Sequence, residues 1–234
     1  MTFLLSIDDT DSLDSRGTGR LARAIADTLS REYPVQCVTR HQLFVHESIP
    51  YTSHNSCAVI RVGPCAPDQE DRIFSLARDV MNGDFVEGSD PGIAIAHMNA
   101  VTPAVVTFGQ DAKRKVLTQE KARTLARNCS IRLEGLGGTE DGVIGAMAGL
   151  GLASTGYDGR FLQKGTIRNI RGPALAETLL SAGIEMILTM EGIPVTNGMI
   201  MVQEGKSVKP CPVSGKAVLF VEERDGALHA VKRD

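Results

Sequence analysis

The stretch FLLSIDDTDS, residues 3–12, begins with a short apolar run and ends in three closely spaced carboxylates. Phe3–Ile7 has the length and composition of a buried strand, and the polar residues after it indicate a loop at the strand's carboxyl end. Open α/β sheets bind their ligands at such strand ends. The stretch therefore predicts a sheet with a functional loop at one edge.

Asp8, Asp9 and Asp11 stand within four residues, and carboxylates this close repel one another unless a cation or several donors compensate. Mg2+ prefers oxygen ligands, commonly one or two carboxylates together with water and substrate phosphates. We predict that these three aspartates bind Mg2+ and nucleotide phosphate, with Thr10 and Ser12 in the same nucleotide-binding loop. Two alternatives stay open. One is a solvated turn, and the other is a phosphatase-type site with Asp9 as nucleophile and Asp11 as acid.

A second candidate follows directly, in the residues Gly17, Thr18, Gly19 and Arg20. They open an amphipathic helix that we expect over residues 18–31. Backbone amides at a helix N-terminus bind phosphate well, glycines allow close approach, and the Arg20 side chain would add charge. The alternative is an ordinary helix start with glycine in the turn.

The third candidate is the glycine-rich stretch 135–151, which predicts a tight loop followed by a helix over residues 142–153. It matches neither the Walker nor the Rossmann phosphate motif. Gly142, Gly145 and Gly149 fall on one helical face, and each glycine costs about 1 kcal/mol relative to alanine. We expect a closely packed backbone or a ligand to compensate. The nucleotide-binding residues predicted here are Gly138, Thr139, Asp141, Gly142 and Gly145.

A polar loop near residues 48–56 is a weaker candidate for substrate contact, through Tyr51, His54 and Asn55.

In the rest of the sequence, strand-like and helix-like segments alternate, which favours an α/β or α+β fold. We expect strands at 35–45, 57–62, 93–96, 166–170 and 185–189, helices at 68–81, 118–127 and 173–182, and β-hairpins over 199–232.

The composition narrows the class of protein. With 234 residues, 42% hydrophobic, the chain can form a substantial core, and its net charge of -3 argues against unaided nucleic-acid binding. Its most apolar stretch, residues 143–153, is far short of the ~20 residues that a membrane span needs. The five cysteines are scattered, which is typical of free thiols in a reducing compartment. We therefore expect a cytoplasmic protein that binds no membrane.

Several motifs together resemble the agmatinylcytidine synthetase family, which modifies the wobble cytidine of an archaeal isoleucine tRNA. The resemblance covers roughly residues 1–200. Its motifs are Ile7–Ser12, the glycine and threonine before the first helix, Ile49-Pro50-Tyr51, Asp90-Pro91-Gly92 and Gly142–Ala146.

The alternating pattern after residue 199 predicts a short β-rich C-terminal extension. The resemblance implies a kinase-like module with a mixed sheet, joined to a ferredoxin-like subdomain. It implies a catalytic-module-like region over 1–203, with a middle subdomain near 63–130, and a β-hairpin extension over 204–234. In such enzymes ATP activates the cytidine carbonyl by phosphorylation, and agmatine displaces the phosphate. By matching position, Asp8, Asp9 and Asp11 would hold Mg2+ and phosphates, and Thr18 would lie beside the transferring phosphate. Gly138–Gly145 would line the nucleotide site.

The sequence also departs from the family. Thr52, Ser53 and His54 follow Ile49-Pro50-Tyr51 where the family carries lysine and arginine, and the C-terminal region has the single Cys211. We therefore expect a stand-alone relative that lacks the nucleic-acid-binding barrel and the zinc ribbon. It would be a magnesium-dependent ATP-using kinase- or ligase-type enzyme that acts on an unknown small acceptor and binds tRNA weakly by itself. The alternative is a non-catalytic nucleotide-binding sensor or partner subunit.

Overall fold

A computed structural model describes residues 1–10, 17–49, 55–84 and 88–233. The chain divides into two compact units, Met1–Thr155 and Gly156–Asp234, which are described separately below. The sequence places its boundary later, between residues 203 and 204. The structure divides the chain earlier because strands before residue 203 pair with strands after it, as described for the second unit.

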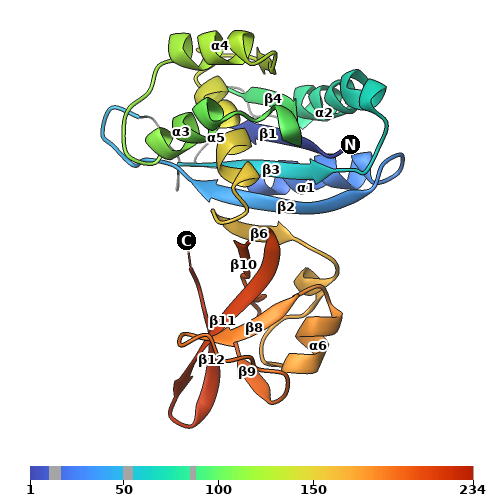
Figure 1. The fold of residues 1–234 in the computed structure, drawn as a ribbon, viewed down its shortest axis with the longest axis vertical. Helices are drawn as coiled ribbons and strands as arrows, with labels where there is room; N and C mark the ends of the chain where they lie inside the picture. The colour runs from blue at the N-terminus through green and yellow to red at the C-terminus, as the bar shows by residue number, and fades with distance from the viewer. Residues whose placement is uncertain (11–16, 50–54, 85–87, 234) are drawn as a thin grey trace. The chain divides into compact units, whose positions relative to one another are not determined.

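The first unit is built on one sheet in which β1 (Phe3–Asp8) has a neighbour on each side. Within this unit the strand order is β5-β4-β1-β3-β2, and each pair of neighbours is antiparallel (Figure 1). The other strands are β2 (Val35–Gln42), β3 (Ser56–Val62), β4 (Gly92–His97) and β5 (Arg132–Gly135). Every residue of β1 is buried, as expected for a strand covered on both faces.

Two helices cover one face of this sheet, α1 (Thr18–Leu29) and α2 (Glu70–Asp84), the latter preceded by the short turn η1 (Pro67–Gln69). The succession β1-α1-β2-β3-α2-β4, with strand order β4-β1-β3-β2, is the ferredoxin-like arrangement. The structure thus confirms the predicted class, in which helices and strands combine. Residues 63–130, for which we expected a middle subdomain, lie within this unit, where they form α2, β4 and two further helices on the opposite face of the sheet.

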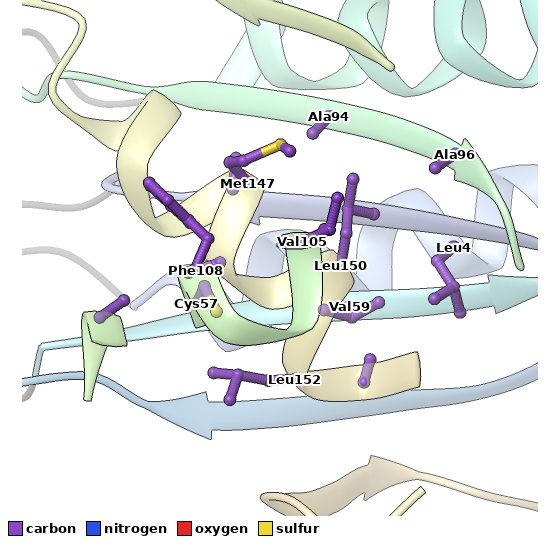
Figure 2. Packing of buried hydrophobic residues seen from close by; sticks show 14 of the residues in the cluster. Leu4, Cys57, Val59, Ala94, Ala96, Val105, Phe108, Met147, Leu150 and Leu152 are labelled. Atoms are coloured by element: carbon purple, nitrogen blue, oxygen red, sulfur yellow. The ribbon is translucent and has the colours of Figure 1, made fainter. Parts of the chain in front are cut away.

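The opposite face carries α3 (Pro103–Ala112), α4 (Gln119–Asn128) and α5 (Gly142–Ser154), after the short turn η2 (Met98–Ala100). Figure 2 shows their core, in which Met147 and Leu150 of α5 lie among Leu4, Val59 and Ala94 of the sheet. Helix α5 is buried on nearly all sides because α3 packs against its outer surface. Thr118 caps α4, its hydroxyl accepting a hydrogen bond from the Lys121 amide.

The glycines of α5 allow this helix to lie directly on β1. A Cβ atom built on Gly145 would overlap the Asp8 carboxylate, and one built on Gly149 would overlap the Ser6 hydroxyl. Four helical residues rise about 6 Å, and two strand residues advance about 6.8 Å, so the two spacings nearly match. The glycine face therefore follows the side chains of alternate residues of β1, and at Gly142 it meets backbone atoms of Asp90, Gly92 and Asp8.

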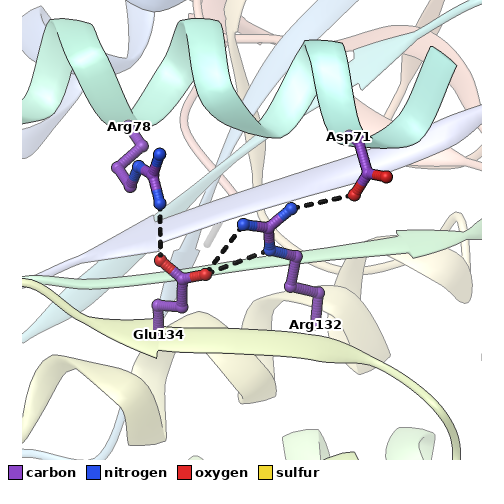
Figure 3. A network of polar contacts seen from close by, with 4 residues as sticks. All are labelled: Asp71, Arg78, Arg132 and Glu134. Carbon is purple, nitrogen blue, oxygen red and sulfur yellow. Dashed lines mark hydrogen bonds and ion pairs between the residues drawn. The ribbon is translucent and has the colours of Figure 1, made fainter.

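An ionic network fastens the edge strand β5 to α2 (Figure 3). The Arg132 guanidinium donates to Asp71 of α2 and to Glu134 of its own strand, and Arg78 of α2 also pairs with Glu134. Arg132 lies 3.8 Å over the ring centroid of Phe74. Because β4 is the one described strand that pairs with β5, these contacts supply lateral support that the strand ladder does not.

The second unit contains a curled mixed sheet around β11 (Lys216–Arg224). This strand pairs with β10 (Cys211–Val213) and β12 (Ala227–Val231) in antiparallel fashion, and with β8 (Met186–Thr189) in parallel. Strand β9 (Met199–Met201) pairs with β12 and with β7 (Ala174–Leu175). The remaining elements are β6 (Arg160–Gln163), η3 (Ile167–Asn169) and α6 (Ala176–Ser181).

The strand predicted over 166–170 is wrong, because the chain turns there instead of extending. Gly165 has φ 49, and the Thr166 amide donates to the carbonyl of Ala182. The Asn169 amide then donates back to Thr166, which closes the single 3-10 turn η3.

Within the described ranges, no helix combines the length and the apolar character needed to cross a membrane.

Candidate functional site

The carboxyl end of β1 opens into a cavity of about 150 Å³ in the first unit. Six separate parts of that unit contribute to its wall: the end of β1, the start of α1, the β2–β3 region, the segment before β4, the end of α3 and the start of α5. The lining residues are Asp8, Asp9, Thr18, Leu43, Ser48, Ile49, Asn55, Ser56, Asp90, Ala112, Lys115, Val116, Leu117, Asp141, Gly142, Ile144 and Gly145.

Asp8 is the last residue of β1, and its side chain is buried against the first turns of α5. It can occupy this place only because residue 145 has no side chain. The N-terminal end of a helix carries partial positive charge, which favours a carboxylate close to it. Asp8 is therefore held at one position on the cavity wall.

Asp9 has a left-handed backbone, with φ 50, directly after the strand. Residues other than glycine adopt this conformation rarely, and they concentrate at functional sites. The next residue, Thr10, is buried, and within the described part of the chain its hydroxyl oxygen has no hydrogen-bond partner. A buried hydroxyl without a partner is costly, so this turn retains an unsatisfied polar atom beside two carboxylates.

Two helix N-termini meet at the cavity. Gly17, with φ 81, precedes α1, and Thr18 lines the wall at the first position of that helix. Gly142 is the first residue of α5 and Asp141 its N-cap, and both line the wall. Partial positive charge from two helices thus faces a space bordered by carboxylates, which suits an anionic ligand bound together with a cation.

The segment Asp90-Pro91-Gly92 holds the loop before α5. The Asp90 carbonyl accepts the Gly142 amide at 2.8 Å, and the Pro91 carbonyl accepts the Leu136 amide at 2.8 Å. The Asp90 carboxylate accepts the amide of Thr139. Any side chain on Gly142 would reach within 2.5 Å of the Asp90 carbonyl oxygen, so glycine is required there.

The contacts of this loop show where the residues predicted to bind nucleotide lie. Gly138 has φ 58 and lies against the Asp90 carboxylate. The side chain of Gln119 donates to the Thr139 carbonyl and to the Asp141 carboxylate, each at 2.7 Å. Asp141, Gly142 and Gly145 line the cavity, while Gly138 and Thr139 support the loop behind it.

Of the other predicted residues, Asn55 lines the cavity wall, and the rest lie apart from it or outside the described residues. Arg20 pairs with Asp84 at the end of α2 and does not line the wall, and Gly19 is in the first turn of α1. Asn55 does line it and donates to the Phe44 carbonyl at 2.6 Å. The predicted residues outside the described ranges are Asp11, Ser12, Tyr51 and His54.

The donor set can be compared with what Mg2+ requires. Among the described residues, no three His, Cys, Asp or Glu side chains form a group that could hold a metal ion. Mg2+, however, commonly takes only one or two carboxylates and fills its other positions with water and phosphate oxygens. Asp8 and Asp9 fit that requirement. The carboxylates of Asp90 and Asp141 are already hydrogen-bonded to the α5 loop and to Gln119.

Sequence reasoning assigned no role to Asp90 or Lys115, although both line the cavity. The Asp90-Pro91-Gly92 motif was visible, but the loop it holds lies about fifty residues further along the chain. Lys115 follows α3, a helix that the sequence pattern did not predict. The apolar part of the wall, which includes Leu43, Ile49 and Val116, was missed for the same reason: distant segments form it.

Comparison with known proteins gives structural matches only, since no family model and no curated protein matches this sequence. The chain is similar to a tRNA fluorescent labeling enzyme, with 24% identity and a TM-score of 0.56. It is also similar to TiaS, a tRNA agmatidine synthetase. The apo form matches with 22% identity and a TM-score of 0.55, and the complex with its isoleucine tRNA and ATP matches with 23% identity and a TM-score of 0.56. Each match covers 64% of this chain.

The chain spans about 36% of the length of the solved structures that it matches. At these identities the comparison concerns the fold. It confirms that the resemblance to agmatinylcytidine synthetases, inferred from the motifs, extends to the three-dimensional structure.

Proposed function

We propose that this chain binds ATP with Mg2+ in the cavity at the end of β1 and uses it to activate an acceptor by phosphorylation. The observation that carries the proposal is the meeting of Asp8 and Asp9 with the N-termini of α1 and α5 at one cavity wall. Carboxylates alone would repel ATP, and helix N-termini alone would not need carboxylates. Together they suit a phosphate chain that is bound with a divalent cation.

The residues on the cavity wall would have separate roles in binding ATP. Asp8 and Asp9, with Asp11 from the same loop, would hold Mg2+, which neutralises phosphate charge when bound. Gly17 to Gly19 would offer backbone amides to phosphate, and Thr18 would lie beside the phosphate that is transferred. The loop that Asp90 fastens would present Asp141 and Gly142 on the part of the wall next to Asp8.

The similarity to TiaS supports ATP use in a tRNA-modifying type of reaction. TiaS has been solved with its isoleucine tRNA, AMPCPP and agmatine together. By analogy, a carbonyl oxygen of the acceptor would attack the γ-phosphorus of ATP, and ADP would leave. An amine nitrogen would then attack the activated carbon, the carbon–oxygen bond would break, and phosphate would leave as the amine loses a proton. We take the acceptor to be a base in RNA or in a free nucleotide.

The test is the variant Asp9→Asn, measured by ATP binding in the presence of Mg2+ and by ADP formation with candidate acceptors. Asparagine tolerates the left-handed backbone at this position, so the variant should fold normally. We expect nucleotide binding to be lost and thermal stability to be kept or raised, because one of several repelling carboxylates is gone. The matched control is Asp79→Asn, an exposed position on α2 that does not line the cavity.

Normal ATP binding by Asp9→Asn would overturn the proposal, and unfolding of the variant would show that the loop is structural. ATP binding by the wild-type chain, without ADP formation from any nucleotide or RNA acceptor, would instead favour the non-catalytic sensor or partner subunit.

A further inference from the structure

Lys115 is the one cation among the described residues that line the cavity. It follows α3, and its neighbours Val116 and Leu117 line the same wall. Its amide donates to the Asp111 carbonyl at 2.8 Å, which fixes the backbone at this point. The segment 115–117 is therefore part of the built wall and not an adjoining surface loop.

The ammonium group of Lys115 is held only loosely. Its Nζ atom lies 2.9 Å from Asp111 Oδ1, in an ion pair four residues apart on the surface. The Lys115 side chain is 62% exposed, and exposed pairs of this kind contribute little to stability. The side chain can therefore leave Asp111 at small cost, while its backbone stays in place.

The charges on the cavity wall favour such a movement when a ligand with phosphate groups binds. Four carboxylates line the cavity, from Asp8, Asp9, Asp90 and Asp141, against this single ammonium. A bound triphosphate would add several negative charges to the same small space. A metal held at Asp8 and Asp9 would neutralise one end of that chain, at the β1 side. Lys115 lies on the part of the wall that follows α3, whereas Asp8 and Asp9 lie on the part at the end of β1. From there its ammonium would bind phosphate oxygens other than those at the metal.

We propose that Lys115 leaves Asp111 when nucleotide binds and donates to a phosphate oxygen of that nucleotide. The assignment rests on the proposed ATP function of the cavity. The alternative is a surface lysine that only stabilises the C-terminal end of α3, since cations are favourable there. That alternative predicts no difference between ligands with and without phosphates.

The experiment compares ATP and adenosine binding to Lys115→Met in the full chain by titration calorimetry with Mg2+. We expect ATP affinity to fall about ten- to a hundredfold, the size of one charged hydrogen bond, and adenosine affinity to stay unchanged. Lys115→Arg should keep most of the ATP affinity because it keeps the charge. Asp111→Asn should bind ATP as well as the wild type or better. Lys121→Met, an exposed position on α4 outside the cavity wall, is the matched control.

Equal losses for ATP and adenosine in Lys115→Met would overturn the proposal, because they would indicate a structural role. Unchanged ATP affinity in that variant would overturn it as well, while leaving the ATP function of the cavity intact. If the wild-type chain binds no ATP at all, the proposed function fails and the role of Lys115 fails with it.

Discussion

The exclusion of a side chain at residue 145 allows a sharp test of the site. Gly145→Ala adds one methyl group that would overlap the Asp8 carboxylate and lie only 3.0 Å from the Asp8 Cβ atom. Overpacking of this kind costs about 1–3 kcal/mol. Alanine in place of glycine within a helix returns about 1 kcal/mol. We therefore expect the free energy of unfolding to fall by only about 0–2 kcal/mol.

The effect on nucleotide use should be much larger. The Asp8 carboxylate must move before the methyl group fits, and a displacement of about 1 Å at a reacting centre can reduce the rate about 100-fold. The assay measures ADP formation and Mg2+-dependent ATP binding alongside chemical denaturation of the same sample. We expect ADP formation and ATP binding both to be largely lost in a protein that is still folded.

Gly149→Ala is the matched control, since it lies one turn further along the same helix. Its methyl group would overlap the Ser6 hydroxyl and lie 3.0 Å from the Cys57 sulfur, away from the cavity wall. The loss of stability should be similar, and nucleotide binding should survive. If Gly145→Ala binds ATP normally, or if both variants lose binding in proportion to their stability, the reasoning about Asp8 is refuted.

Two further results are expected of the wild-type chain. Mg2+ and ATP together should raise stability by about 2.7 kcal/mol at 100 times the dissociation constant, and neither alone should do so as well. A scanning-fluorimetry titration at millimolar ATP that shows no shift would contradict the nucleotide site. Bulk tRNA should bind no better than about 10⁻⁴ M at physiological salt, because a chain with net charge -3 offers few phosphate contacts. Fluorescence titrations at several salt concentrations measure this, and submicromolar, steeply salt-dependent affinity would restore RNA as a strong partner.

Local patterns predicted the elements on which the site is built. The apolar run 3–7 is β1, the periodic residues after Thr18 form α1, and the glycine-laced segment from Gly142 forms α5. In each case the burial that stabilises the element follows from the pattern of the residues themselves. The glycines of α5 also predicted a close approach by a packed backbone or a ligand, because so many in one helix need compensation.

The sequence pattern alone does not predict which helices and strands meet at the cavity. Helix α3 was missed because its β-branched residues and Gly109 weaken the helical signal, and it is stabilised by packing against α5. Strand β5 is short and charged, and its place at the edge depends on Arg132 and Glu134 bonding to α2. Both elements depend on tertiary contacts, and the packing of α3 against α5 places the end of α3 at the cavity wall.

Several unfavourable features gather near the end of β1, where we propose the nucleotide site. Among the described residues, the buried hydroxyls of Ser6 and Thr10 have no hydrogen-bond partner, and each such group costs about 1–3 kcal/mol. Asp9 has a left-handed backbone between Asp8 and Thr10. Purely structural selection would replace Ser6 and Thr10 with apolar residues and relax this turn. The doubly covered sheet supplies the stability that tolerates these costs, and their concentration beside two carboxylates is the pattern expected where a ligand is bound.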